Sequence, residues 1–212
     1  MYIYLVIYIL MFSFREAGYK LVVEILLVCL LAKIKHYKLK YLFYSWAFYP
    51  VLIVQCMLVI FQFSLFFNTY FFVKFVPISE PSMILSFVFA LFAYRLYKPA
   101  IVGSASVFFG TILNKFVIAQ NAGKMPVFPS LSYKTGYLNP NMFGSTDSVH
   151  ILGNADTKYI FLTDYIDYGY SILSPGDVFI HLFACIMLYF MIAAVNDRYG
   201  DLKKELKVRG QI

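Results

Sequence analysis

Four residues of this chain carry side chains suited to acid–base chemistry: His150, Asp164, Asp177 and His181. Asp177 and His181 lie four residues apart, so a helix would place them on one face, where the carboxylate can orient the imidazole or raise its pKa. The spacing of the His and Asp residues matches no metalloprotease, calcium-loop or nucleophile-elbow pattern. Asp side chains in stretches rich in Gly and Pro serve most often as turn residues. We therefore treat these four as candidate catalytic residues, and the sequence predicts no metal site.

Three ionisable residues fall within apolar stretches: Glu24, Lys115 and His181. Charges at such a depth in a membrane are costly and are either functional or paired with one another. From the helical rise, each lies about 5 to 10 Å below the same membrane surface, which allows them to meet, for example as a Glu24–Lys115 ion pair. In the alternative interpretation Lys115 extends to the surface, Glu24 pairs with Lys20, and His181 binds a backbone carbonyl.

The composition indicates which elements position these residues. Of the 212 residues, 61% are hydrophobic, 20% are aromatic and 14% are charged, against about 25% charged in soluble domains. The sequence therefore predicts an all-helical protein that crosses a lipid bilayer several times. In such a protein basic residues are concentrated in the cytoplasmic loops, so the net charge of +7 does not indicate a nucleic-acid partner. The three cysteines lie in apolar stretches and predict no disulfide.

Five stretches are predicted to cross the membrane, and they cover residues 20–32, 51–67, 79–96, 100–119 and 177–195. Residues 1–14 are short for a span and predict an interfacial or tilted helix, or else a sixth span. Ser79, Glu80 and Pro81 indicate a helix start. Small or polar residues at 106, 110 and 114 form a face that allows a neighbouring helix to approach closely.

Residues 119–176, here called the cap segment, are too polar and too rich in Gly, Pro, Asn and Asp to lie in hydrocarbon. A connection this long is usually functional or disordered, and its many aromatic residues favour a folded cap. Basic residues gather in 33–40, 95–98 and the tail 197–212, which predicts that these parts are cytoplasmic and that the cap segment is outside. The chain thus divides into N-terminal spans (1–118), the cap segment (119–176), a last span (177–196) and the basic tail.

A set of motifs in and around the cap segment resembles a known family. The chain reads Asn-Ala-Gly-Lys-Met-Pro-Val at 121–127, then His150, Leu-Thr-Asp at 162–164 and Ser-Pro-Gly-Asp at 174–177. This resembles an uncharacterised family of bacterial multi-pass membrane proteins, a domain of unknown function. Ala122 and Thr163 stand where that family has glycine, and Asp167 stands where it has proline.

The resemblance implies the location of a site but does not imply a reaction or a cofactor. Besides the acid–base candidates, the residues that it implies as binding residues are Asn114, Asn121, Gly123, Met125, Pro126, Thr157, Ser174 and Gly176.

The function expected first is non-enzymatic: a subunit of a larger membrane complex, or a binder of a small amphiphile beneath the cap, in a bacterial cell membrane. A small secondary transporter or channel is the first alternative, suggested by the three ionisable residues at one depth. The second is a membrane-embedded lipid hydrolase or transferase that uses His150 or His181 with Asp164 or Asp177.

Overall fold

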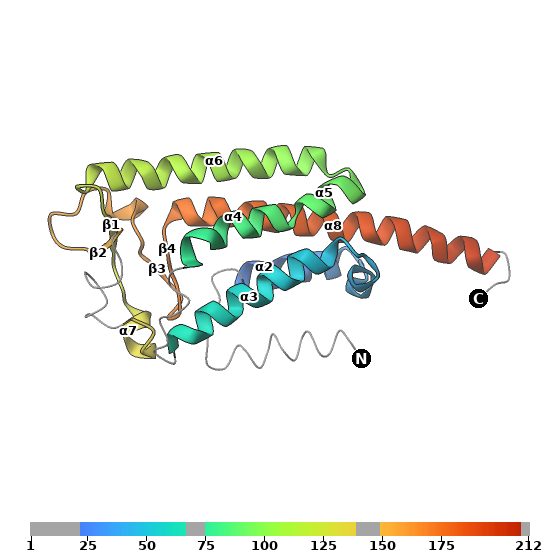
Figure 1. Cartoon of the computed structure of the whole chain (residues 1–212), viewed down its shortest axis with the longest axis horizontal. Coiled ribbons are helices and arrows are strands. Elements are labelled where there is room, and N and C mark those ends of the chain that lie inside the picture. Colours follow the sequence, from blue (N-terminus) through green and yellow to red (C-terminus); the bar gives the residue numbers. More distant parts are fainter. Residues whose placement is uncertain (1–21, 67–74, 139–148, 209–212) are drawn as a thin grey trace.

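The computed structural model describes residues 22–66, 75–138 and 149–208. The predicted segment 1–14 and the predicted partner Lys20 lie outside these residues. The described helices are α2 (Val22–Ile34), the 3-10 helix η1 (Leu39–Tyr44), α3 (Phe48–Phe66), α4 (Val76–Ser86), α5 (Val88–Tyr94), α6 (Tyr97–Gln120) and α8 (Pro175–Val208). The long helices run side by side along the long axis of the molecule (Figure 1).

The protein is mostly helical, as predicted. Among the described residues, two helical stretches are long and apolar enough to cross a membrane, judged by length and composition: Tyr97–Gln120 and Pro175–Gly200. Both coincide with stretches that the sequence predicts to be spans. Pro50 is the third residue of α3, in the first turn, where its missing N–H costs no hydrogen bond.

The predicted helix over residues 79–96 is instead two helices, and its predicted start is wrong. α4 begins at Val76 with a proline in its first turn, so Ser79 is not an N-cap and Pro81 lies inside the helix. Helix α4 ends where the Ser86 hydroxyl donates to the carbonyl of Met83 at 2.7 Å, a local bond that competes with the helical pattern. α5 follows after Phe87 and ends at Arg95, which has a left-handed backbone.

Helices α6 and α8 pack along two glycines of α6. A Cβ at Gly110 would overlap the carbonyl oxygen of Gly176, and a Cβ at Gly103 would lie 2.8 Å from the ring of Phe183. The absence of these Cβ atoms lets the two backbones approach. The predicted small-residue face therefore includes Gly110 and Asn114, whereas the Ser106 hydroxyl bonds to its own helix at the Gly103 carbonyl.

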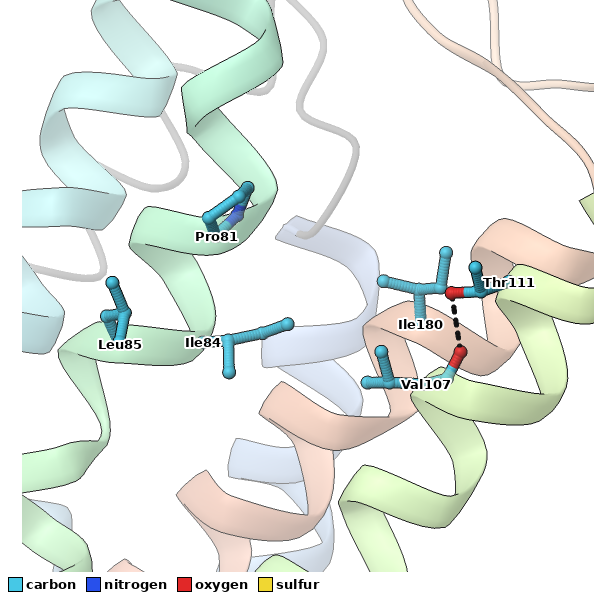
Figure 2. Close-up of a pocket in the computed structure, with 6 residues that line it drawn as sticks. All are labelled: Pro81, Ile84, Leu85, Val107, Thr111 and Ile180. Atoms are coloured by element: carbon cyan, nitrogen blue, oxygen red, sulfur yellow. Dashed lines mark hydrogen bonds between the residues drawn. The ribbon is translucent and has the colours of Figure 1, made fainter.

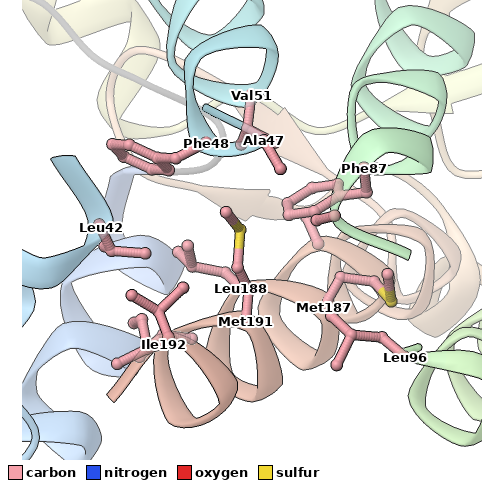
Figure 3. Packing of buried hydrophobic residues seen from close by; sticks show 14 of the residues in the cluster. Leu42, Ala47, Phe48, Val51, Phe87, Leu96, Met187, Leu188, Met191 and Ile192 are labelled. Atoms are coloured by element: carbon pink, nitrogen blue, oxygen red, sulfur yellow. The ribbon is translucent and has the colours of Figure 1, made fainter. Parts of the chain in front are cut away.

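Helix α8 carries the centre of the hydrophobic core. Its buried Met187, Met191 and Ile192 face residues from η1, α3 and the α4–α5 region, including Leu42 and Phe87 (Figure 3). Unbranched methionines fill irregular space between helices of different direction. This packing fixes α8 in the middle of the bundle.

The cap segment contains short strands that an all-helical prediction did not foresee. They are β1 (Met125–Val127), β2 (His150–Leu152), β3 (Ile166–Asp167) and β4 (Ile172–Leu173), with the short helices α7 (Leu131–Thr135) and η4 (Ile160–Leu162) between them. β1 pairs with β2 in parallel, and β3 pairs with β4 antiparallel. The described part of this segment lies at one end of the helices, beside the C-terminus of α6 and the N-terminus of α8 (Figure 1).

Candidate functional site

The motif at 174–177 forms the N-terminus of α8. The Asp177 backbone N–H donates to the Ser174 hydroxyl at 3.0 Å, and the Ser174 N–H donates to the Asp177 carboxylate at 3.1 Å. This reciprocal pair is a capping box with Asp in place of the usual Glu. The two side chains thereby satisfy N–H groups that the first turn leaves open.

Asn114 of α6 joins this cap. Its amide donates to the Asp177 carboxylate at 2.9 Å, and its carbonyl oxygen accepts from the Ser174 hydroxyl at 2.8 Å. A Cβ on Gly176 would overlap the Asn114 side chain, so a glycine is required there. The expected pairing of Asp177 with His181 is wrong, because Asp177 is held by Asn114 and Ser174. These four motif residues form a joint between two helices.

Asn121 and its neighbours shape the exit from α6. Ala122 and Gly123 follow with positive φ angles of 54° and 77°, which turn the chain sharply into β1. The Asn121 side chain pairs with the backbone of Lys158, accepting from its N–H at 2.9 Å and donating to its carbonyl at 3.1 Å. Thr157 closes a turn with Asn154 just before this contact.

The pairing of the strands brings His150 and Asp164 together across β1. His150 on β2 pairs with Met125 on β1, and Val127, also on β1, forms a parallel bridge with Asp164. His150 Nε2 lies 3.6 Å from Asp164 Oδ2. The His150 side chain is 39% exposed and that of Asp164 is 7% exposed. Met125 and Pro126 of β1, the strand that pairs with both partners, are buried.

Asp167 links two parts of the cap segment, the start of α7 and the β3–β4 connection, a role that the sequence did not predict. Its carboxylate accepts from the N–H groups of Ser130, Ser132 and Gly169 and from the Ser132 hydroxyl, at 2.6 to 2.9 Å. Burial acts to raise the pKa of this carboxyl, but the hydrogen bonds from Ser132, Ser130 and Gly169 outweigh it and the pKa lies below its ordinary value.

Glu24 of α2 and His181 of α8 form a buried pair beneath the cap segment. Glu24 Oε1 lies 3.5 Å from His181 Nδ1, and the two side chains are 15% and 8% exposed. Within the described residues neither Glu24 Oε2 nor His181 Nδ1 has a hydrogen-bond partner. Lys115 is exposed on α6 and makes no ion pair with Glu24, so the expected Glu24–Lys115 pair is wrong. A largely buried pair with unfilled hydrogen-bonding capacity stabilises little.

Two tyrosines of the β3–β4 connection lie within the electrostatic reach of Glu24. Burial raises the pKa of Tyr170 to about 12, and the negative charges of Glu24 and Tyr168 add to this. The pKa of Tyr168 is raised by the same two causes, burial first and Glu24 second. The two rings lie 5.9 Å apart between centroids. Glu24, His181, Tyr168 and Tyr170 together are here called the Glu24–His181 site, and no motif in the sequence pointed to its tyrosines.

An apolar groove of about 370 Å³ runs between α4, α6 and α8. It is lined by Pro81, Ile84 and Leu85 on α4, Val107 and Thr111 on α6, and Ile180 on α8 (Figure 2). The one polar side chain in this lining, Thr111, donates its hydroxyl to the Val107 carbonyl and so offers no free donor. Ile180 immediately precedes His181, so the groove and the Glu24–His181 site lie at the same level of α8, on faces about 100° apart.

Among the residues that the structure describes, no three His, Cys, Asp or Glu side chains gather as metal ligands would. The described residues therefore offer two imidazole–carboxylate pairs, one in the cap segment and one beneath it, and a helix joint.

Comparison with protein-family models matches residues 38–189 to a family of unknown function (DUF5317). This range includes the joint, the His150–Asp164 pair and His181, whereas Glu24 precedes it. No curated protein matches the chain, and no solved structure does.

Proposed function

We propose, for a chain that belongs to DUF5317, a family of unknown function, that it is a multi-pass membrane protein and binds a small amphiphile beneath its cap segment. The proposed spans are α2, α3, the α4–α5 pair, α6 and α8. The amphiphile lies in the apolar groove with its polar group at the Glu24–His181 site, in the cell membrane of a bacterium.

Helix α6 supports the membrane location most strongly. Only 17% of its apolar stretch is buried inside the structure, whereas the core helix of a soluble protein would be mostly buried. Its exposed residues include Ile101, Val102, Phe108, Ile112 and Phe116. Apolar surface of this extent is costly in water and favourable in lipid.

The distribution of basic residues supports the orientation. Lys33, Lys35, Lys38, Arg95 and Lys98 are exposed near the end of the helices that lies away from the cap segment (Figure 1). Basic residues next to spans remain in the cytoplasm. The cap segment then lies outside the cell, and the C-terminus lies inside.

The choice of an amphiphile as the ligand rests on one observation: of two consecutive residues of α8, one lines an apolar groove and the next belongs to a polar site. Ile180 lines the groove, and His181 pairs with the buried Glu24. A ligand with an apolar chain joined directly to a polar group matches this arrangement, because pockets combine apolar walls with a few polar groups that fix orientation.

A groove-filling substitution tests the proposal. Leu85 is 63% exposed and lines the groove, so Leu85→Trp fills space without disturbing the core. The matched control is Phe92→Trp on α5, which is equally exposed but lies outside the groove lining. After purification in mild detergent, mass spectrometry of extracted ligands is expected to find one amphiphile per chain in the wild type and in Phe92→Trp, and to find it depleted in Leu85→Trp.

The proposal fails if the wild type purifies without any amphiphile or if Leu85→Trp retains it in full. A stoichiometric protein partner in the same preparation would instead support a role as a subunit of a complex.

A lipid hydrolase or transferase is a second candidate, favoured by the His150–Asp164 pair. An imidazole 3.6 Å from a buried carboxylate can act as a general base. The candidate predicts that His150→Ala removes turnover of an outer-leaflet lipid; unchanged turnover excludes it. Proton-coupled transport by the Glu24–His181 pair is tested by uptake into reconstituted vesicles.

A further inference from the structure

We propose that the polar group bound at the Glu24–His181 site is an ammonium group, and that the Glu24 carboxylate binds it by an ion pair and a hydrogen bond. The inference rests on the proposed binding of an amphiphile and specifies its chemical class: an amine or ammonium headgroup on an apolar chain.

The first argument is the charge of Glu24. Its side chain is 15% exposed, and the described group within 4 Å that can carry positive charge is His181, which is charged only if protonated. A buried carboxylate is costly unless it is paired and hydrogen-bonded. An ammonium group supplies both the countercharge and the donors.

The second argument is the set of open acceptors. Glu24 Oε2 has no hydrogen-bond partner in the described structure, and the same holds for His181 Nδ1, which is an acceptor in one tautomer of the neutral ring. An ammonium group has three donors and no acceptor, which fits two acceptors side by side. A phosphate or carboxylate headgroup would face the charge of Glu24, and an alcohol would leave that charge uncompensated.

The test compares two probes with the same chain, dodecylamine and dodecanol, by native mass spectrometry of the full-length protein in mild detergent. The wild type is expected to bind dodecylamine at least about tenfold more tightly than dodecanol, because hydrogen bonds to charged groups exceed neutral ones by this order. Glu24→Gln removes the charge and keeps the shape, and it is expected to bind both probes with similar affinity. The control Asp156→Asn changes an exposed carboxylate of the cap segment and is expected to keep the preference.

The outcomes separate this inference from the proposed function. If the wild type binds both probes equally, or if Glu24→Gln keeps the preference for the amine, the ammonium site is overturned while the amphiphile remains. If Leu85→Trp leaves the binding of both probes unchanged, the groove itself is excluded. A Glu24→Gln protein that melts at the wild-type temperature excludes misfolding as the cause of a lost preference.

Discussion

Ala122 is held in the left-handed backbone region at φ 54°, next to Gly123 at φ 77°. This conformation costs a residue with a Cβ about 1–2 kcal/mol, whereas glycine adopts it at little cost. The tight exit from α6 requires both angles, since the Gly123 N–H bonds back to the Ile118 carbonyl at 2.9 Å. The alanine is thus a source of local strain that a glycine at this position would avoid.

Ala122→Gly is therefore expected to stabilise the protein by about 1 kcal/mol, and Gly123→Ala to destabilise it by a similar amount. A Cβ at Gly123 would meet no atom within 4 Å, so the cost there is purely conformational. Thermal unfolding in mild detergent measures both changes. Ala155→Gly, at an exposed turn residue without positive φ, is the control and should not stabilise. Equal effects of Ala122→Gly and Ala155→Gly would contradict the assignment.

The stability of the cap segment is expected to depend on pH through Asp167. Its folded pKa lies below the ordinary 3.8, so its contribution to stability is complete above that value and is lost as the pH falls through the folded pKa. Asp167→Asn is expected to speed hydrogen exchange in residues 129–138 at pH 7. As the pH falls through the folded pKa, the variant and wild type should converge, because the wild-type carboxyl becomes protonated. A difference that persists unchanged at low pH would show that its charge is irrelevant.

At the scale of elements, the contact between α6 and α8 determines the position of the site. Glycines allow the close approach, and Asn114 links α6 to the capping box at the start of α8. The direction of α8 in turn places Ile180 at the groove and His181 opposite Glu24. A substitution at this joint should therefore alter the positions of Ile180 and His181.

Gly110→Ala is expected to destabilise the protein by about 1–3 kcal/mol, because its Cβ would overlap the backbone oxygen of Gly176, which cannot rotate away. Gly200→Ala on α8 is the matched control. It meets no atom within 4 Å and gains helix propensity, so it should be neutral or stabilising by up to about 1 kcal/mol. Thermal unfolding distinguishes them. Equal melting temperatures for the two variants would refute the close contact.

The elements that the sequence predicted well have local signals. The apolar stretches 100–119 and 177–195 are long enough to be recognised from composition alone, and they coincide with α6 and α8. The strands of the cap segment are two or three residues long, too short for a period-two pattern, and depend on pairing across distant parts of the chain. The partner of Glu24 is also a distant contact: His181 follows it by 157 residues, and no spacing rule connects them.

At the scale of the whole molecule, the orientation is a separate prediction. In a variant with Cys29, Cys56 and Cys185 replaced by alanine, a membrane-impermeant maleimide is expected to label Asp156→Cys in intact cells. Lys35→Cys, at the opposite end of the helices, should be labelled only after lysis. Both positions are exposed, so accessibility within the protein is matched. The reverse pattern would place the cap segment in the cytoplasm.

The most direct test of the central claim, that an amphiphile lies across α8 between the groove and the Glu24–His181 site, is an experimental density map of the protein purified from its native membrane. The predicted result is elongated density along Leu85, Val107 and Ile180 that ends within hydrogen-bonding distance of Glu24. A map in which side chains close the groove and Glu24 bonds to another residue of the protein would contradict it.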